Sequence, residues 1–178
     1  NAPWLALSLK QESAPPQADP GYQSERFRYW VAHVRTALPN IADIDIRVRE
    51  NDRHAYFVVT YRGNIQVPSS GLSDGTLRIL TLTLLPYLSE SPRILVTEEP
   101  ENGIHPRAVE AVLQSLAAIH DCQVLVSSHS PVVLARTELA NLLCARPNPA
   151  GGMEIIPGTE HPRLRDWQGG IDLGSLFA

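Results

Sequence analysis

The second half of the sequence alternates apolar runs with a helix-like segment, and this alternation limits the folds open to the chain. RILVTE at 93–98 and QVLVSSHS at 123–130 are nearly continuous apolar runs. Between them, PRAVEAVLQSLAAIHD at 106–121 has helical spacing, with Pro106 in its first turn. Such apolar runs are typical of strands buried on both faces of a parallel sheet. Strand, helix and strand in this order predict an α/β fold with a largely parallel sheet flanked by helices.

The preceding segment has the pattern of one helix followed by antiparallel strands. Apolar residues recur at helical spacing over 24–40, with Ser24 as the expected cap and Pro39 as the expected stop. IADIDIRVRE at 41–50 alternates apolar and charged residues, and HAYFVVTYRGNIQVP at 54–68 predicts a hairpin that turns at 62–64. We therefore expect an N-terminal helix plus an antiparallel hairpin beside the α/β part.

Further segments complete the expected organisation. SDGTLRILTLTLLPYLSE at 73–90 predicts a helix that Ser73 or Asp74 opens and that Pro86 ends or kinks. SPVVLARTEL at 130–139 indicates a helix, and NLLCARP and MEIIP indicate short strands. Residues 1–23 are rich in proline and small polar residues, which predicts a linker or extended arm. Residues 24–178 are then expected to form one unit.

Length, charge and cysteine use exclude several classes of protein. A chain of 178 residues supports one core of ordinary size, and its net charge of −4 excludes a globally basic surface. No apolar run approaches the roughly 18 residues of a spanning helix, so we expect no membrane segment. Cys122 and Cys144 show no metal-binding spacing and are expected to be reduced thiols of a cytoplasmic protein. Met153 is the only methionine, which indicates a piece of a longer protein.

Acidic residues follow the first apolar run at the point where the predicted strand ends. Glu98 and Glu99 are consecutive, so in a strand their side chains point to opposite faces. This favours a division of labour, in which Glu98 helps to hold a hydrated Mg²⁺ ion and Glu99 reaches a water near a phosphate. The alternative is a solvated acidic loop.

Two other segments point to phosphate chemistry. SSGLSDGTLRIL places glycines and serines at the start of a helix, where unpaired N–H groups attract anions. VLVSSHSPVVL places His129 just after a strand. The alternatives here are an ordinary helix cap and a structural histidine.

Taken in order, the motifs resemble those of a known family. SGLSDGT, ILVTEEPENGIHP and VLVSSHSP resemble the signature motif, the Walker B strand with its D-loop, and the switch histidine of ABC-type ATPases. The likeness is to the non-transporter branch of RecF-like, SMC-like and OLD-like proteins and their AAA-labelled relatives in phage defence and DNA repair. It covers residues 69–135 closely and implies the carboxyl-terminal lobe of a P-loop NTPase-like head over 24–178, which hydrolyses ATP between two head domains.

The resemblance also implies roles for individual residues. Ser73 and Gly75 match signature positions that contact the γ-phosphate of ATP held by a second copy of the head. Glu98 matches the acid that supports Mg²⁺ through water, and Glu99 matches the carboxylate that polarises the attacking water. His129 matches the histidine at the γ-phosphate. Asn102 and His105 belong to the D-loop, which crosses the dimer interface.

Three departures from the family pattern stand out. Glu98 replaces aspartate, Asp74 puts a negative charge beside the expected triphosphate, and GxxxxGK[ST] occurs nowhere in the sequence. Without that loop nothing cradles the β-phosphate, so these residues alone are expected to bind ATP weakly or not at all. The expected partners are therefore an N-terminal lobe and a second head, together with DNA or an effector protein.

Two other functions fit the same residues less well. The chain could be a non-catalytic head or scaffold that docks a partner protein. It could also be a metal-dependent phosphoesterase built on Glu98, Glu99, His105 and His129, although no toprim-like acidic motif accompanies them.

Overall fold

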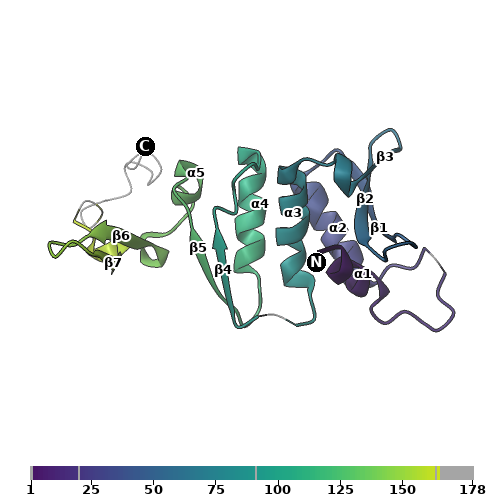
Figure 1. Ribbon diagram of the computed structural model, residues 1–178, viewed down its shortest axis with the longest axis horizontal. Helices are drawn as coiled ribbons and strands as arrows, with labels where there is room; N and C mark the ends of the chain where they lie inside the picture. The colour runs from purple at the N-terminus through teal and green to yellow at the C-terminus, as the bar shows by residue number, and fades with distance from the viewer. Residues whose placement is uncertain (1, 20, 91, 163, 165–178) are drawn as a thin grey trace. The chain divides into compact units, whose positions relative to one another are not determined.

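The computed structural model describes residues 2–19, 21–90, 92–162 and 164 (Figure 1). The chain divides into two compact units, Asn1–Ser127 and Ser128–Ala178, and each is described by itself. The boundary falls inside the single unit predicted for 24–178. The chain is mixed α/β, with both parallel and antiparallel pairs of strands.

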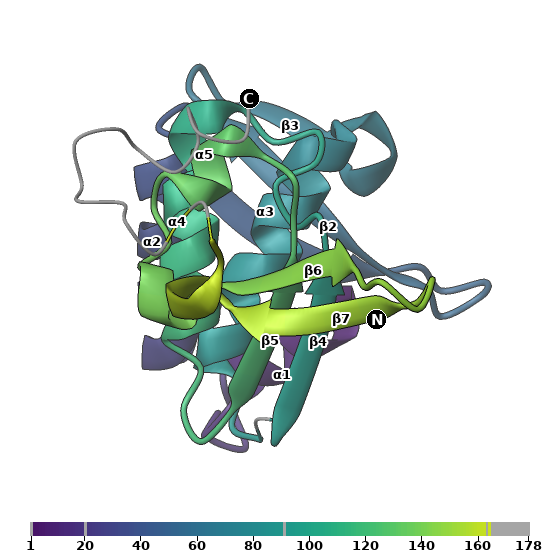
Figure 2. The same cartoon turned by 90° about the vertical axis from the view of Figure 1, so that its left-hand side faces the viewer.

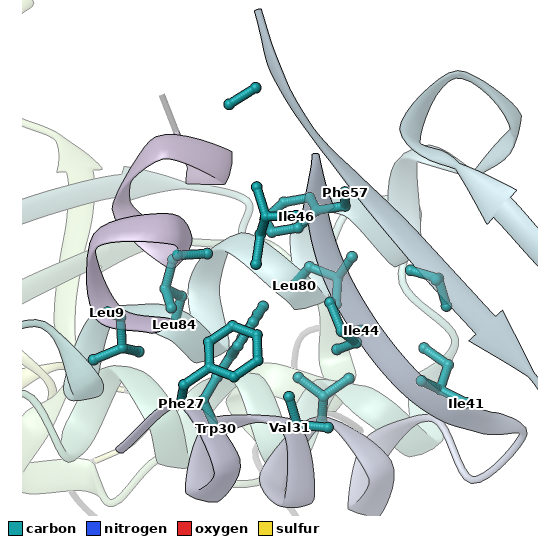
Figure 3. Packing of buried hydrophobic residues seen from close by; sticks show 14 residues of the cluster. Leu9, Phe27, Trp30, Val31, Ile41, Ile44, Ile46, Phe57, Leu80 and Leu84 are labelled. Carbon is teal, nitrogen blue, oxygen red and sulfur yellow. The ribbon is translucent and has the colours of Figure 1, made fainter. Parts of the chain in front are cut away.

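In the first unit, helix α2 (Glu25–Ala37) packs on an antiparallel sheet, and the two form the main part of the hydrophobic core. Helix α2 is capped by Ser24, whose Oγ accepts a hydrogen bond from Phe27 N. The sheet has the order β1 (Ile41–Val48), β2 (Ala55–Tyr61), β3 (Ile65–Pro68). Phe27 and Trp30 of α2 meet edge to face, and Trp30 also contacts Phe57 of β2 (Figure 3). The predicted helix, alternating strand and hairpin are confirmed.

The first residues of the chain form a helix where a linker was predicted. Helix α1 (Ala2–Gln11) buries Ala6 and Leu9 in the same core. Figure 3 shows Leu9 among the core residues. Ser24 ties α1 to α2, because its N–H donates to Lys10 O at 2.9 Å and its Oγ donates to Leu9 O at 2.5 Å. The prediction of a linker or extended arm over 1–23 is therefore wrong for 2–11. The prediction counted Pro3 against a helix, but Pro3 lies in the first turn of α1, where proline is tolerated.

Two further helices continue the unit. Helix α3 (Asp74–Leu84) follows the 3₁₀ turn Ser69–Gly71, and it ends in a second 3₁₀ turn, Leu85–Tyr87, that contains Pro86 as predicted. Helix α4 (Pro106–Ala117) lies beside α3, and α3 also contacts α2 (Figure 1). Leu80 and Leu84 of α3 belong to the same hydrophobic core as the buried residues of α1, α2 and the sheet (Figure 3).

Helix α4 connects two parallel strands. β4 (Ile94–Glu98) pairs with β5 (Gln123–Ser127) from Ile94↔Gln123 to Glu98↔Ser127. This confirms the predicted strand, helix and parallel strand. The predicted largely parallel sheet is wrong for the described residues, since this pair is their only parallel one. Nor are its strands buried on both faces, because Ile94, Val96 and Leu125 are 60%, 66% and 40% exposed.

The second unit is built on a short antiparallel pair (Figure 2). β6 (Leu143–Pro147) and β7 (Met153–Pro157) confirm the predicted short strands, and Arg146 Nε lies 2.6 Å from Glu154 Oε1 across them. Helix α5 (Pro131–Leu134) is shorter than predicted, and the 3₁₀ turns Leu139–Asn141 and Gly158–Glu160 flank the pair.

Candidate functional site

The start of α3 presents polar groups at its exposed end. Ser73 is the cap: its Oγ accepts from Thr76 N at 3.2 Å and lies 3.0 Å from Thr76 Oγ1. Ser73 and Asp74 are both exposed. Asp74 lies in the first turn, where a carboxylate interacts favourably with the positive end of the helix dipole. The predicted capping role is therefore present, and Ser73 rather than Asp74 performs it.

Gly75 places the start of α3 directly against the loop that follows β4. A Cβ on Gly75 would lie 2.2 Å from Gly103 O and 3.1 Å from Gly103 C. Any larger residue here would force the helix or the loop to shift, because the atoms that its Cβ would meet are main chain. Two motifs that are nearly thirty positions apart in sequence are thus packed backbone to backbone.

Glu98 and Glu99 occupy different backbone conformations. Glu98 is the last residue of β4 and is exposed, whereas Glu99 has a φ of 42°, in the left-handed region. The strand alternation used to place the two side chains on opposite faces therefore ends at Glu98. Glu99 N donates to Ser127 O at 2.8 Å, so the end of β5 holds the turn. Left-handed backbone is costly for a residue with a Cβ and is enriched at functional sites.

The loop after Glu99 is closed by its own hydrogen bonds. Asn102 N donates to Glu99 O at 3.0 Å, and Asn102 Nδ2 lies 3.5 Å from Glu99 Oε2. Gly103 has a φ of 74°, and Ile104 is buried. His105 caps α4, because its Nδ1 accepts from Arg107 N at 3.2 Å. Asn102 thus lies beside Glu99, while His105 has a structural role that the sequence did not indicate.

Arg78 is a residue of this site that the sequence analysis did not place at Glu99. Its Nη1 donates to Glu99 O at 3.2 Å. Arg78 and Gly75 are three residues apart and lie on the same face of α3, so both face the loop after β4. That spacing is the signal that could have identified it.

The remaining predicted residue is not placed with the others. His129 is exposed and belongs to the second unit, between β5 and α5. Its role therefore remains a prediction.

Among the residues that the structure describes, no three His, Cys, Asp or Glu side chains gather closely enough to hold a metal ion. Within the same ranges, every helix is too short or too polar to cross a membrane.

Comparison with known proteins identifies the family. Residues 14–135 match the family described as "AAA domain, putative AbiEii toxin, Type IV TA system". The chain is also 30% identical over 86 residues to the Old nuclease of Escherichia phage P2; the match covers 42% of this chain but 15% of that protein. The family match takes in Ser73, Gly75, Glu98, Glu99 and His129, and it covers well over half of the chain. The chain therefore belongs to this family of AAA-type P-loop ATPase domains.

Proposed function

We propose that these residues form part of an ABC-type head that binds and hydrolyses ATP and acts by nucleotide-dependent dimerisation. The observation that carries the proposal is the contact of Gly75 with Gly103. It brings the capped start of α3 and the acidic loop after β4 together into one site. Phosphoryl transfer depends mainly on positioned donors, a metal and an oriented water, which such a site can supply.

Each residue has a part in this proposal that suits its place. Ser73, exposed at the cap of an eleven-residue helix, and the buried Gly75 of its first turn take the signature role at the γ-phosphate of ATP held by a second head. Glu98, with its carboxylate exposed at a strand end, supports Mg²⁺ through water, and oxygen ligands are those that Mg²⁺ prefers. Mg²⁺ would neutralise phosphate charge. Glu99 orients the attacking water.

Three other residues complete the proposed head. Asn102, which lies beside Glu99, and His105 belong to a loop that faces the second head. Because His105 Nδ1 accepts from Arg107 N, only its Nε2 side is left for that contact. His129 contacts the γ-phosphate. None of these assignments requires a covalent intermediate.

We further propose that a lobe outside these 178 residues supplies the phosphate loop. The sequence has no GxxxxGK[ST], and one face of β4 and β5 exposes Ile94, Val96 and Leu125. Parallel strands are usually covered on both faces, so an apolar layer on this side would complete the fold. These residues alone are expected to bind ATP weakly or not at all. Micromolar affinity by calorimetry would contradict this.

The biological setting is proposed from the relatives. The Old nuclease belongs to a phage, and the family description names a toxin of a toxin–antitoxin system. We propose a cytoplasmic ATPase of phage defence or DNA repair that couples hydrolysis to DNA or to an effector protein. The nuclease activity in the relative's name is not assigned to this chain.

Substitution of Glu99 tests the proposed chemistry. In the full-length protein, Glu99→Gln should lower ATP turnover by about 100-fold or more, because the amide cannot polarise water as the carboxylate does. ATP-dependent association of heads, followed by light scattering, should persist or strengthen. The matched control is Glu90→Gln, which removes an exposed carboxylate before β4. Unchanged turnover in Glu99→Gln would refute the role of Glu99.

A further inference from the structure

We propose that Arg78 is a positioning residue that holds Glu99 in the conformation required for hydrolysis. Arg78 would act on the main chain of Glu99 and not on nucleotide. The inference rests on the proposed ATPase function and adds a residue to it. It starts from the hydrogen bond of Arg78 Nη1 to Glu99 O, at 3.2 Å.

Glu99 needs such support because its backbone is unusual. Its φ of 42° is a conformation that a glutamate adopts at a cost and retains only where neighbours impose it. Its N–H is held by Ser127 O at 2.8 Å, and its carbonyl accepts from Asn102 N at 3.0 Å. Arg78 supplies the carbonyl with a second, charged donor. Of these donors and acceptors, Arg78 alone comes from α3, so it is the link from that helix to the acid.

The position of Arg78 on α3 connects the start of this helix to Glu99. Gly75, one turn earlier on the same face, contacts Gly103 O. The helix is therefore joined to the loop at Glu99 through Arg78 and at Gly103 through Gly75. Ser73 caps the same helix. A shift of α3 caused by a phosphate at Ser73 would therefore move the carbonyl of Glu99. Arg78 thus couples the phosphate-facing end of α3 to the water-orienting carboxylate.

The space around Arg78 permits a chemical test of this role. An open hollow of about 230 Å³ is lined by Leu77, Arg78, Thr81, Leu82, Thr97 and Pro100. Because the hollow is open and Arg78 is part of its lining, truncation of Arg78 would enlarge it and leave room for a small guanidinium ion from solution. Such an ion has the donors needed to reach Glu99 O.

The experiment measures steady-state ATP hydrolysis by the full-length protein carrying Arg78→Ala. We expect kcat to fall by about fivefold to tenfold, the loss of one charge-assisted hydrogen bond at an exposed site, with KM for ATP unchanged. Millimolar guanidinium should restore part of kcat, and Arg78→Lys should be intermediate because lysine offers a single ammonium in place of the planar fork. Arg28→Ala, which truncates an exposed arginine of α2, should match the wild type with and without guanidinium.

The results separate the alternatives. Unchanged kcat in Arg78→Ala, while Glu99→Gln abolishes turnover, would overturn the role of Arg78 and leave the proposed function intact. A raised KM at constant kcat would overturn it as well, because it would make Arg78 a nucleotide contact. A loss of kcat that guanidinium does not restore, together with a fall in melting temperature, would also overturn the role of Arg78, because Arg78 would then act on stability alone. Absence of ATP hydrolysis in the wild-type protein would overturn both proposals.

Discussion

Replacement of Gly75 by alanine tests the close approach of α3 to the loop after β4. The added Cβ would lie 2.2 Å from Gly103 O, a separation that real Cβ atoms do not show. For this distance to reach 3.0 Å, helix or loop must shift by about 0.8 Å. Neither partner has a side chain that can rotate away, so the backbone itself must move.

The cost of Gly75→Ala follows from two opposing effects. Overpacking of this kind costs about 1–3 kcal/mol. Alanine in place of glycine returns at most about 1 kcal/mol of helix propensity, and less in the first turn of a helix. Displacement of the loop also strains Gly103, with its φ of 74°, and lengthens the Arg78 bond to Glu99. We therefore expect the free energy of unfolding to fall by about 1–2 kcal/mol.

Urea unfolding measures this change as a shift of the midpoint at constant slope. Gly71→Ala is the matched control: its Cβ would lie 2.9 Å from Val67 Cγ1, and a half-buried valine side chain can turn aside. We expect the control to lose less than about 1 kcal/mol. If Gly75→Ala is as stable as the wild type, the packing of α3 on Gly103 is wrong, and with it the geometric basis of the proposed site.

Three other predictions concern the core and its polar contacts. Leu9→Ala should cost about 2–4 kcal/mol in urea unfolding, since Leu9 is 4% exposed; no loss would show that α1 does not dock. Thr83→Val should cost about 1–3 kcal/mol, because it leaves the buried Trp30 Nε1, 3.1 Å from Thr83 Oγ1, without its acceptor; Thr83→Ser should be milder. Burial lowers the pKa of His33, so the folded protein binds fewer protons than the unfolded chain, and stability should fall as pH drops below about 6.5. His33→Asn should reduce that slope in melting curves recorded from pH 7.5 to about 5.5, and an unchanged slope would contradict the assignment.

Local signals in the sequence predicted much of the fold. Ser24 was predicted as one cap, and Ser73 or Asp74 as another, because a side-chain oxygen ahead of a helical pattern satisfies early N–H groups. Ser24 and Ser73 both accept such a bond. The hairpin turn was predicted from glycine and asparagine, which adopt the positive φ that Gly63 and Asn64 have, at 87° and 63°. Each of these features depends on residues only a few positions apart.

Tertiary contacts accounted for the features that were missed. Helix α1 is stabilised by burial of Ala6 and Leu9 against α2 and the sheet, and a proline-rich sequence context concealed it. The open face of β4 and β5 was missed because apolar runs do not indicate whether a covering layer lies in the same chain.

The same distinction between local signals and tertiary contacts applies to the candidate site. Glu98, Glu99, Ser73 and Gly75 were identified as a set only because their motifs resemble a family, and a motif does not reveal backbone conformation. The left-handed φ of Glu99 depends on Ser127, which is remote in sequence. Helical spacing places Arg78 on the same face as Gly75, but it does not reveal that Arg78 reaches the carbonyl of Glu99. The cap by His105 was missed because histidine is not among the residues typical of that position.

The contacts of α3 determine which part of the site can move. Ser73, Gly75 and Arg78 lie within one and a half turns, and an α-helix of this length is stiff, so the three shift together. The loop from Glu99 to Gly103 has left-handed backbone at both of these residues and is joined to α3 by the Gly75 contact and the Arg78 bond. A displacement of α3 would therefore pass into this loop more readily than into β4, whose ladder to β5 runs up to Glu98. On this argument Glu98 stays with the sheet while Glu99 follows the helix, so two adjacent carboxylates can respond differently to what binds at Ser73.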